Sequence, residues 1–252
     1  MLHGSFYLFS VFALCLVLAA YFYAWILRKS RQARGELDSE IKKIRDIETK
    51  VNLSLKCGKV TPIQEAPTGQ VVKIGGQIEA ADKTLYAPLS GRGCVFYDVV
   101  VEQYSKNGPQ EWLPLFRDTN AVDFYIVDDT DRALVQLAKL RTELRAAAER
   151  DHYASSGTFN DATPELEAYL SRHGQSSTVV GMNRQLRYRE GVFEPGEHVV
   201  AMGTAIREQS TEPRNAGSGY RGAARRFVLG PLPGGSILIS DDSELAESTA
   251  SS

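Results

Sequence analysis

Residues 85–104, LYAPLSGRGCVFYDVVVEQY, change at Cys94 from turn residues to a run of valines and aromatic residues. Ser90, Arg92 and Cys94 alternate with two glycines, which suits either a loop that presents a nucleophile or a turn that starts a strand. The run from Val95 to Tyr104 has the two-residue period of a β-strand, with an apolar face and a face that carries Asp98 and Glu102. We interpret the stretch as a strand preceded by a glycine-flanked turn.

The residue types in this stretch do not predict catalysis. A reactive cysteine needs a lowered pKa and exposure to solvent, whereas Cys94 begins an apolar strand and is expected to pack in the core. Asp151 and His152 could form an acid–base pair, but neighbours in sequence rarely point at one another. The chain has no nucleophile elbow, Walker loop, H-E-x-x-H or Rossmann glycine pattern. The sequence therefore favours a protein without enzymatic activity, and we expect no cofactor.

Composition and charge exclude further classes. The net charge of −2 gives no reason to expect a nucleic-acid partner. A RING domain holds zinc with sets of four Cys and His ligands in paired spacings. This chain has three Cys and four His, and they are not clustered, so we expect no RING and no metal site.

The amino-terminal region predicts a membrane anchor. Residues 6–27 run for 22 positions without a charge, and as a helix they would span roughly 33 Å, the thickness of a bilayer core. A cleaved signal peptide is the alternative, but the first five residues lack the expected basic residues. Four basic residues follow in RKSRQAR, residues 28–34. This asymmetry predicts a single-pass membrane protein with its N-terminus outside and its carboxy-terminal domain on the cytoplasmic side.

A charged, amphipathic segment follows the apolar span. Within residues 28–57, apolar side chains recur at helical spacing: Leu37, Ile41, Ile44, Ile47, Val51 and Leu55. The predicted juxtamembrane helix could associate with a second copy, lie on the bilayer, or pack on the domain that follows. We take it to be a half-buried stalk.

Residues 58–240 read as β-rich, because short apolar runs alternate there with turn residues. The predicted strands are Val71–Glu79, Val95–Tyr104, Trp112–Arg117, Val122–Val127, Leu186–Arg189, His198–Arg207, Arg226–Leu229 and Ser236–Ser240. This number of short strands favours a barrel or a sandwich. Gly75-Gly76 inside the first strand indicates a bulge or a close backbone approach. We expect a flexible loop at 207–224 and a disordered acidic tail at 241–252.

One helix stands out within the β-rich region. In the insert 163–173, Thr163 is a suitable N-cap, Pro164 suits the first helical position, and Gly174 suits the carboxy-terminal end. Residues 131–150 are ambiguous, since their leucines and alanines favour a helix.

A short basic row is the candidate binding site. Arg184, Arg187 and Arg189 alternate in part with Leu186 and Tyr188, as on a strand with one solvated face. Such a row could bind an anion, a lipid headgroup or an acidic partner. The alternative is a set of surface ion pairs with Glu190, Glu194 and Glu197.

Four motifs, taken in order, resemble a known family: GGQIEA, LYAPLSGRGCVFYDVVVEQY, DFYIVDDT and LRYREGVFEPGEHVVAMGTA. They resemble the GIDE domain of MULAN-type membrane-anchored ubiquitin ligases, over roughly residues 58–240. The helical insert resembles the RING-less prokaryotic relatives. In similar proteins two strands follow the motif DFYIVDDT, which favours strand at Leu134–Leu137 and leaves Leu140–Ala147 open.

The predicted protein is thus mainly β: a GIDE-like barrel or sandwich with a helical insert, one transmembrane helix and a juxtamembrane helix. Its expected function is non-catalytic binding or scaffolding at a membrane. The alternatives are a ubiquitin-ligase-related component that relies on a separate RING partner, and a membrane-tethered hydrolase. The expected partners are the lipid bilayer, a protein or anionic ligand, and a second copy through the stalk.

Overall fold

The computed structural model describes six segments of the chain and a few isolated positions. The segments are 49–105, 111–140, 142–179, 181–209, 225–242 and 244–245, and the isolated positions are Leu18, Tyr21, Phe22, Ala24, Trp25 and Arg28. The chain divides into two compact units, Met1–Ile44 and Arg45–Ser252. The isolated positions of the first unit are helical, and the strands, the core and the candidate binding face all belong to the second unit.

The predicted transmembrane helix is contradicted by the structure. Crossing a bilayer as a helix takes about 20 consecutive apolar residues. Across the part of the chain that the structure describes, no helix combines that length with that apolar character. Of residues 6–27, five positions are described, and the others lie outside the described segments. The single-pass topology, the membrane localisation and the cytoplasmic placement of the domain are corrected accordingly.

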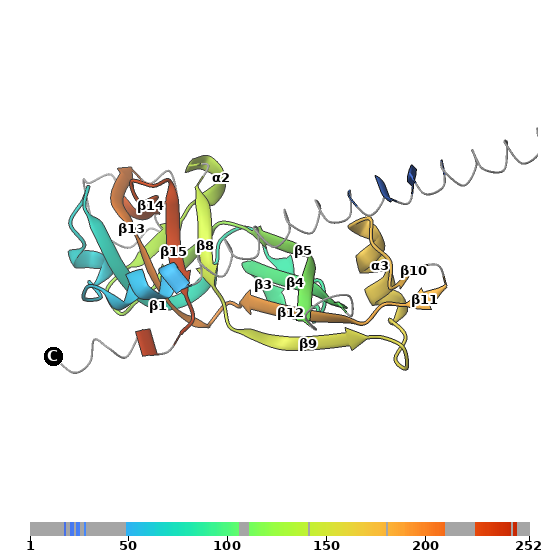
Figure 1. Ribbon diagram of the computed structural model, residues 1–252. Helices are drawn as coiled ribbons and strands as arrows, with labels where there is room; N and C mark the ends of the chain where they lie inside the picture. Colours follow the sequence, from blue (N-terminus) through green and yellow to red (C-terminus); the bar gives the residue numbers. More distant parts are fainter. Residues whose placement is uncertain are drawn as a thin grey trace, which may run out of the picture. The chain divides into compact units, whose positions relative to one another are not determined.

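The larger sheet is a mixed sheet that closes on itself (Figure 1). Its strands, in spatial order, are β1 (Val71–Ala80), β6 (Phe124–Val127), β7 (Arg132–Val135), β14 (Arg225–Gly230), β13 (His198–Gln209), β15 (Ser236–Ser240) and β8 (Glu143–Ala147). The ring closes because β1 also pairs antiparallel with β13 from Val71 to Gln77. The main core fills this ring with side chains such as Ile74, Phe124 and Phe227.

The second sheet is antiparallel and carries the predicted motif strand. Its order is β5 (Glu111–Ala121), β4 (Phe96–Ser105), β12 (Leu186–Phe193) and β9 (Arg150–Ser156). Phe96 and Phe193 pack together at 5.0 Å between ring centroids and belong to the main core. The short elements are η1 (Ile63–Glu65), β2 (Leu85–Tyr86), β3 (Gly93–Cys94), α2 (Leu137–Leu140), β10 (Thr178–Val179) and β11 (Met182–Asn183).

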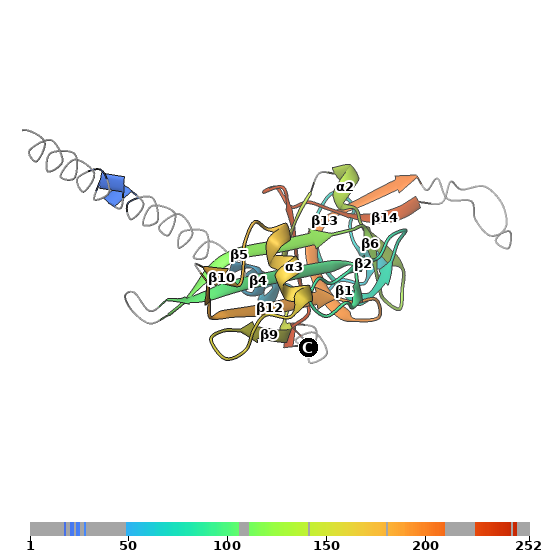
Figure 2. The ribbon, with the colours of Figure 1, turned by 90° about the vertical axis from the view of Figure 1, so that its right-hand side faces the viewer.

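Helix α3 (Pro164–Arg172) covers one face of the second sheet (Figure 2). The Thr163 hydroxyl accepts a hydrogen bond from the backbone N–H of Leu166, which is the capping bond that the sequence predicts. Tyr169 and Leu170 are buried against Val99, Val101, Leu186 and Tyr188 of the sheet. We name this covered side of the sheet the helix face.

A carboxylate also holds α3 in place. The Tyr169 hydroxyl donates to Asp118 at 3.1 Å, and Nε2 of His173 lies 3.3 Å from the same carboxylate. The His173 ring stacks on Phe116, with 4.4 Å between ring centroids. The predicted helical insert 163–173 ends at His173, and the structure adds the contacts of this residue with β5.

The described part of residues 131–150 contains two strands, β7 and β8, despite its helical propensity. β7 and β8 pair in parallel with β14 and β15, and only the short α2 lies between them. Ala133, Val135 and Ala146 belong to the main core. Small side chains suit these crowded positions, and packing decides the outcome.

The described end of the amphipathic segment packs on the domain. Residues 49–56 are helical, and Val51 and Leu55 are buried with Val200 of β13. Leu245, which lies in the tail that the sequence predicts to be disordered, is helical and is buried in the same cluster. Of the predicted flexible loop at 207–224, residues 207–209 belong instead to β13 (His198–Gln209), and residues 210–224 lie outside the described segments, as do residues 31–48 and the rest of the tail.

Candidate binding face

The SGRG turn is held by a buried glutamate from β12. The Glu190 side chain is fully buried, and its carboxylate accepts hydrogen bonds from the backbone N–H groups of Leu89 at 2.8 Å and Ser90 at 3.1 Å. Gly91 has φ of 71°, a conformation that glycine adopts without strain. This turn therefore depends on a residue 100 positions further along the chain.

Arg92 stabilises the other side of the turn through ion pairs with Asp151 and Glu194. Its guanidinium donates two hydrogen bonds to Asp151, at 2.7 and 2.6 Å, and one to Glu194 at 2.9 Å. These bonds raise the pKa of Arg92 and lower the pKa of Asp151. Asp151 is thus engaged by an arginine, and the structure does not support an acid–base pair with His152.

Cys94 is a core residue. Its side chain has no exposed surface and packs with Ala87 and Val192. Burial, followed by the charges of Glu190 and Glu194, raises the pKa of Cys94 to about 11. A thiol in this state is not a nucleophile at neutral pH, which removes the sequence argument for a hydrolase that uses Cys94.

The side of the second sheet opposite α3 carries alternating arginines and carboxylates. We name this side the arginine face and define it by six residues: Asp98, Glu102, Arg117, Arg150, Arg187 and Arg189. The Asp98 carboxylate pairs with Arg117 and, at 2.7 Å, with Arg150. Glu102 accepts from Arg187 and from Arg189, both at 3.0 Å on Oε1. Both carboxylates are nearly fully buried, whereas the arginines are partly exposed.

Arg187 and Arg189 share a single negative charge. Glu102 is 7% exposed in its side chain, and the two arginines are 34% and 32% exposed. One guanidinium is enough to balance one carboxylate, so this group of three side chains carries an excess positive charge at the surface. An acidic group that approaches from solvent would meet that excess.

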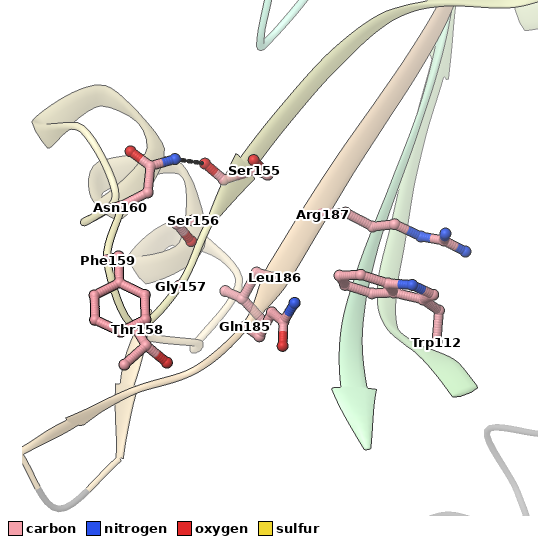
Figure 3. Close-up of a pocket in the computed structure, with 10 residues that line it drawn as sticks. All are labelled: Trp112, Ser155, Ser156, Gly157, Thr158, Phe159, Asn160, Gln185, Leu186 and Arg187. Carbon is pink, nitrogen blue, oxygen red and sulfur yellow. Dashed lines mark hydrogen bonds between the residues drawn. The ribbon is translucent and has the colours of Figure 1, made fainter. Parts of the chain in front are cut away.

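An aromatic groove adjoins Arg187 at the end of the sheet. The Arg187 guanidinium carbon lies 4.5 Å from the centroid of the Trp112 ring, and Figure 3 shows the two side chains stacked face to face. The groove has a volume of about 570 Å³ and is lined by Trp112, Ser155, Ser156, Gly157, Thr158, Phe159, Asn160, Gln185, Leu186 and Arg187. The Phe159 side chain is fully exposed and adds a second aromatic ring to the groove.

The structure separates the three arginines that the sequence grouped. Arg187 and Arg189 lie together on the arginine face. Arg184 precedes β12 and bonds instead to Gln103 and to the backbone carbonyl of Ser176, which follows α3. Arg184 therefore lies on the helix side of the sheet, away from the other two. The predicted surface pairs of the row with Glu190, Glu194 and Glu197 are replaced by the pairs with Glu102.

Sequence reasoning missed Trp112, Arg117 and Arg150 as members of this surface. A signal existed in β4, where Asp98 and Glu102 interrupt a valine-rich strand on one face. Buried carboxylates require cationic partners, so their presence predicts arginines on the neighbouring strands. No metal centre is indicated, since no group of three His, Cys, Asp or Glu that could hold a metal ion occurs in the described segments.

A scan against protein-family models finds no family that matches this chain, and no curated protein matches it. The resemblance to the GIDE domain therefore stays a prediction.

A separate cluster of carboxylates makes stability depend on pH. The pKa of Glu197 is raised to about 7 by burial and, to a smaller extent, by the charges of Asp241, Glu194 and Asp151, against the opposing effect of a hydrogen bond from the backbone N–H of Glu194. Burial also raises the pKa of Asp241 to about 6. Both groups hold their protons to a higher pH in the folded state than in the unfolded state. Their contribution to stability is therefore present at acidic pH and lost as pH rises through 6 to 7.

We expect Glu197→Gln to stabilise the protein at alkaline pH only. Glutamine keeps an oxygen that can accept the Glu194 N–H and removes the charge that burial disfavours. At pH 8 the variant should gain about 1–2 kcal/mol in the free energy of unfolding over the wild type. At pH 4 the two proteins should be equal, because both side chains are then neutral. Urea denaturation at the two pH values measures this, and an equal gain at both would contradict the titration of Glu197.

Proposed function

We propose that this protein is a non-catalytic binding module of GIDE type that holds an acidic partner on its arginine face. The observation that carries the proposal is the pair Arg187 and Arg189, which share one buried carboxylate and remain partly exposed. The stacked Trp112 adds an aromatic surface beside the charge. Arginine beside an aromatic ring is common at the energetic centres of protein interfaces.

Two further observations support a binding role. Cys94 is buried and the Asp151 carboxylate is taken by Arg92, so the residues that suggested chemistry have structural roles. The two most specific elements of the GIDE resemblance, APLSGRGC and YREGVFEPGE, are joined by Glu190 and by the Arg92–Glu194 ion pair. The motifs that suggested the family thus serve one local structure, which holds β12 and its arginines in place.

The test is the affinity of the full-length protein for a fluorescein-labelled hexaglutamate peptide, followed by anisotropy. Arg189→Gln removes the excess charge and leaves Arg187 paired one-to-one with Glu102, so the fold should be retained. We expect the dissociation constant to rise roughly fivefold to tenfold, the equivalent of about 1–1.4 kcal/mol. Binding of the wild type should also weaken as salt is added.

The matched control is Arg225→Gln, which removes one exposed arginine of β14 at a distance in sequence from the arginine face. It should leave the affinity unchanged. An unchanged affinity in Arg189→Gln, or equal binding of a hexalysine peptide by the wild type, would overturn the proposal.

A further inference from the structure

The edge of the second sheet at β9 is open. β9 pairs with β12 on one side, and within the described segments no strand lies on its other side. Figure 1 shows β9 along the rim of this sheet, beside β12. Unpaired strand edges are templates on which another extended chain can add.

The direction in which the backbone N–H and carbonyl groups of β9 point follows from one hydrogen bond made just before the neighbouring strand β12. The carbonyl of Gln185 accepts from the N–H of Tyr104, so it points toward β4. Backbone groups alternate in direction along an antiparallel strand. Tyr188 therefore points its groups toward β9, where its partner is Ala154. The groups of Tyr153 and Ser155, on either side of Ala154, point away from β12.

These outward groups are only partly used. The side-chain amide of Asn160 donates to the Ser155 carbonyl at 2.7 Å and closes that end of the edge. For the N–H and the carbonyl of Tyr153, no hydrogen-bonding partner occurs among the described residues. An added strand would find both groups of Tyr153 and the N–H of Ser155 available.

The register places the arginines beside this edge. Arg189 is opposite Tyr153 and Arg187 is opposite Ser155 across the β9–β12 pair. Tyr153 is 64% exposed on the arginine face. An added strand would be the immediate neighbour of β9 and the second neighbour of β12. Those of its side chains that point to the arginine face would be within reach of the long side chains of Arg187 and Arg189. Acidic residues at alternate positions therefore match the surface.

We infer that the β9 edge binds an extended acidic segment of a partner protein as an added strand, with its acidic residues toward Arg187 and Arg189. The inference rests on the proposed function for the charge of the partner, and the open edge supplies the geometry. The groove at Trp112 and Phe159 lies where β9 ends and can receive an apolar side chain of the segment.

A second copy of this chain fits the edge less well. Pairing β9 with β9 of another copy would bring two arginine faces alongside each other, with excess positive charge on both. Like charges in neighbouring positions of a sheet are destabilising.

The test uses the full-length protein and two labelled decapeptides that alternate glutamate and valine. In one the backbone is unmodified, and in the other the amide of every glutamate is N-methylated, which preserves the charge and blocks the edge that would face β9 with the glutamates on the arginine face. Tyr153→Pro removes the outward N–H of β9, where proline is tolerated because that group has no partner in the sheet. Tyr153→Ala is the control for the lost side chain.

We expect the unmodified peptide to bind at least tenfold more tightly than the methylated one, and Tyr153→Pro to abolish this difference while Tyr153→Ala keeps it. If the wild type bound the two peptides equally, and Arg189→Gln still weakened binding of the acidic peptide, strand addition would be overturned. The proposed function would be left standing. Loss of all peptide binding by the wild type would overturn both. A concentration-dependent dimer in sedimentation that Tyr153→Pro dissolves would assign the edge to a second copy and overturn the inference.

Discussion

Replacing Glu190 by alanine is expected to lower the free energy of unfolding by about 3–5 kcal/mol. The substitution leaves the backbone N–H groups of Leu89 and Ser90 without their acceptor, and each unsatisfied buried group costs about 1–3 kcal/mol. The fully buried side chain also leaves a cavity. Urea denaturation gives the change from the shift in midpoint at constant slope.

Glu190→Gln separates the two contributions. Glutamine fills the same volume and keeps one acceptor oxygen, so the loss should be about half of that for alanine. Glu79, an exposed glutamate of β1, is the control, and Glu79→Ala should change stability by less than about 0.5 kcal/mol. A loss below 1 kcal/mol for Glu190→Ala, at about the level of the control, would show that the turn holds its shape without the buried carboxylate.

The local parts of the fold were predictable because their signals are local. The helix α3 has its N-cap, its proline and its buried stripe within one short segment. The strand β4 follows from the alternation after the SGRG turn. The closure of the larger sheet was not predictable in this way, since it depends on the pairing of β1 with β13, whose partners Val71 and Thr204 lie far apart in sequence.

One ambiguity is resolved and one prediction is wrong, for different physical reasons. In residues 131–150 the helical propensity left the assignment open, and burial of β7 and β8 in the main core favours strands there. For residues 6–27, the uncharged apolar run and the basic residues after it predicted a membrane span, whereas the described part of the chain contains no helix suited to cross a bilayer.

Only part of the arginine face could be predicted from the sequence. The alternation of arginines with apolar residues in β12 correctly identified Arg187 and Arg189. The same pattern was wrongly extended to Arg184, which precedes the strand. The acceptor Glu102 lies 85 positions before Arg187, and no local pattern links them. The excess charge on which the proposed function depends is visible only once β4 and β12 are paired.

Replacing Gly76 by alanine is expected to cost about 3 kcal/mol, while the same change at Gly75 is nearly neutral. A Cβ atom on Gly76 would lie 2.2 Å from the carbonyl oxygen of Val127, which is backbone of the neighbouring β6. The oxygen cannot easily move away, because β6 is paired with β1 on this side and with β7 on the other. Overpacking against fixed backbone costs typically 1–3 kcal/mol and sometimes more.

Gly75 is the matched control because it is the adjacent residue of the same strand. A Cβ there would meet only ordinary contacts, the nearest being a Val60 side-chain carbon at 3.5 Å. Thermal unfolding should show Gly76→Ala melting roughly 6–12 °C below the wild type, with Gly75→Ala within about 2 °C of it. Equal melting of the two variants would mean that β1 and β6 do not approach as closely as the structure shows. The closed sheet would then have to be reconsidered at this pair of strands.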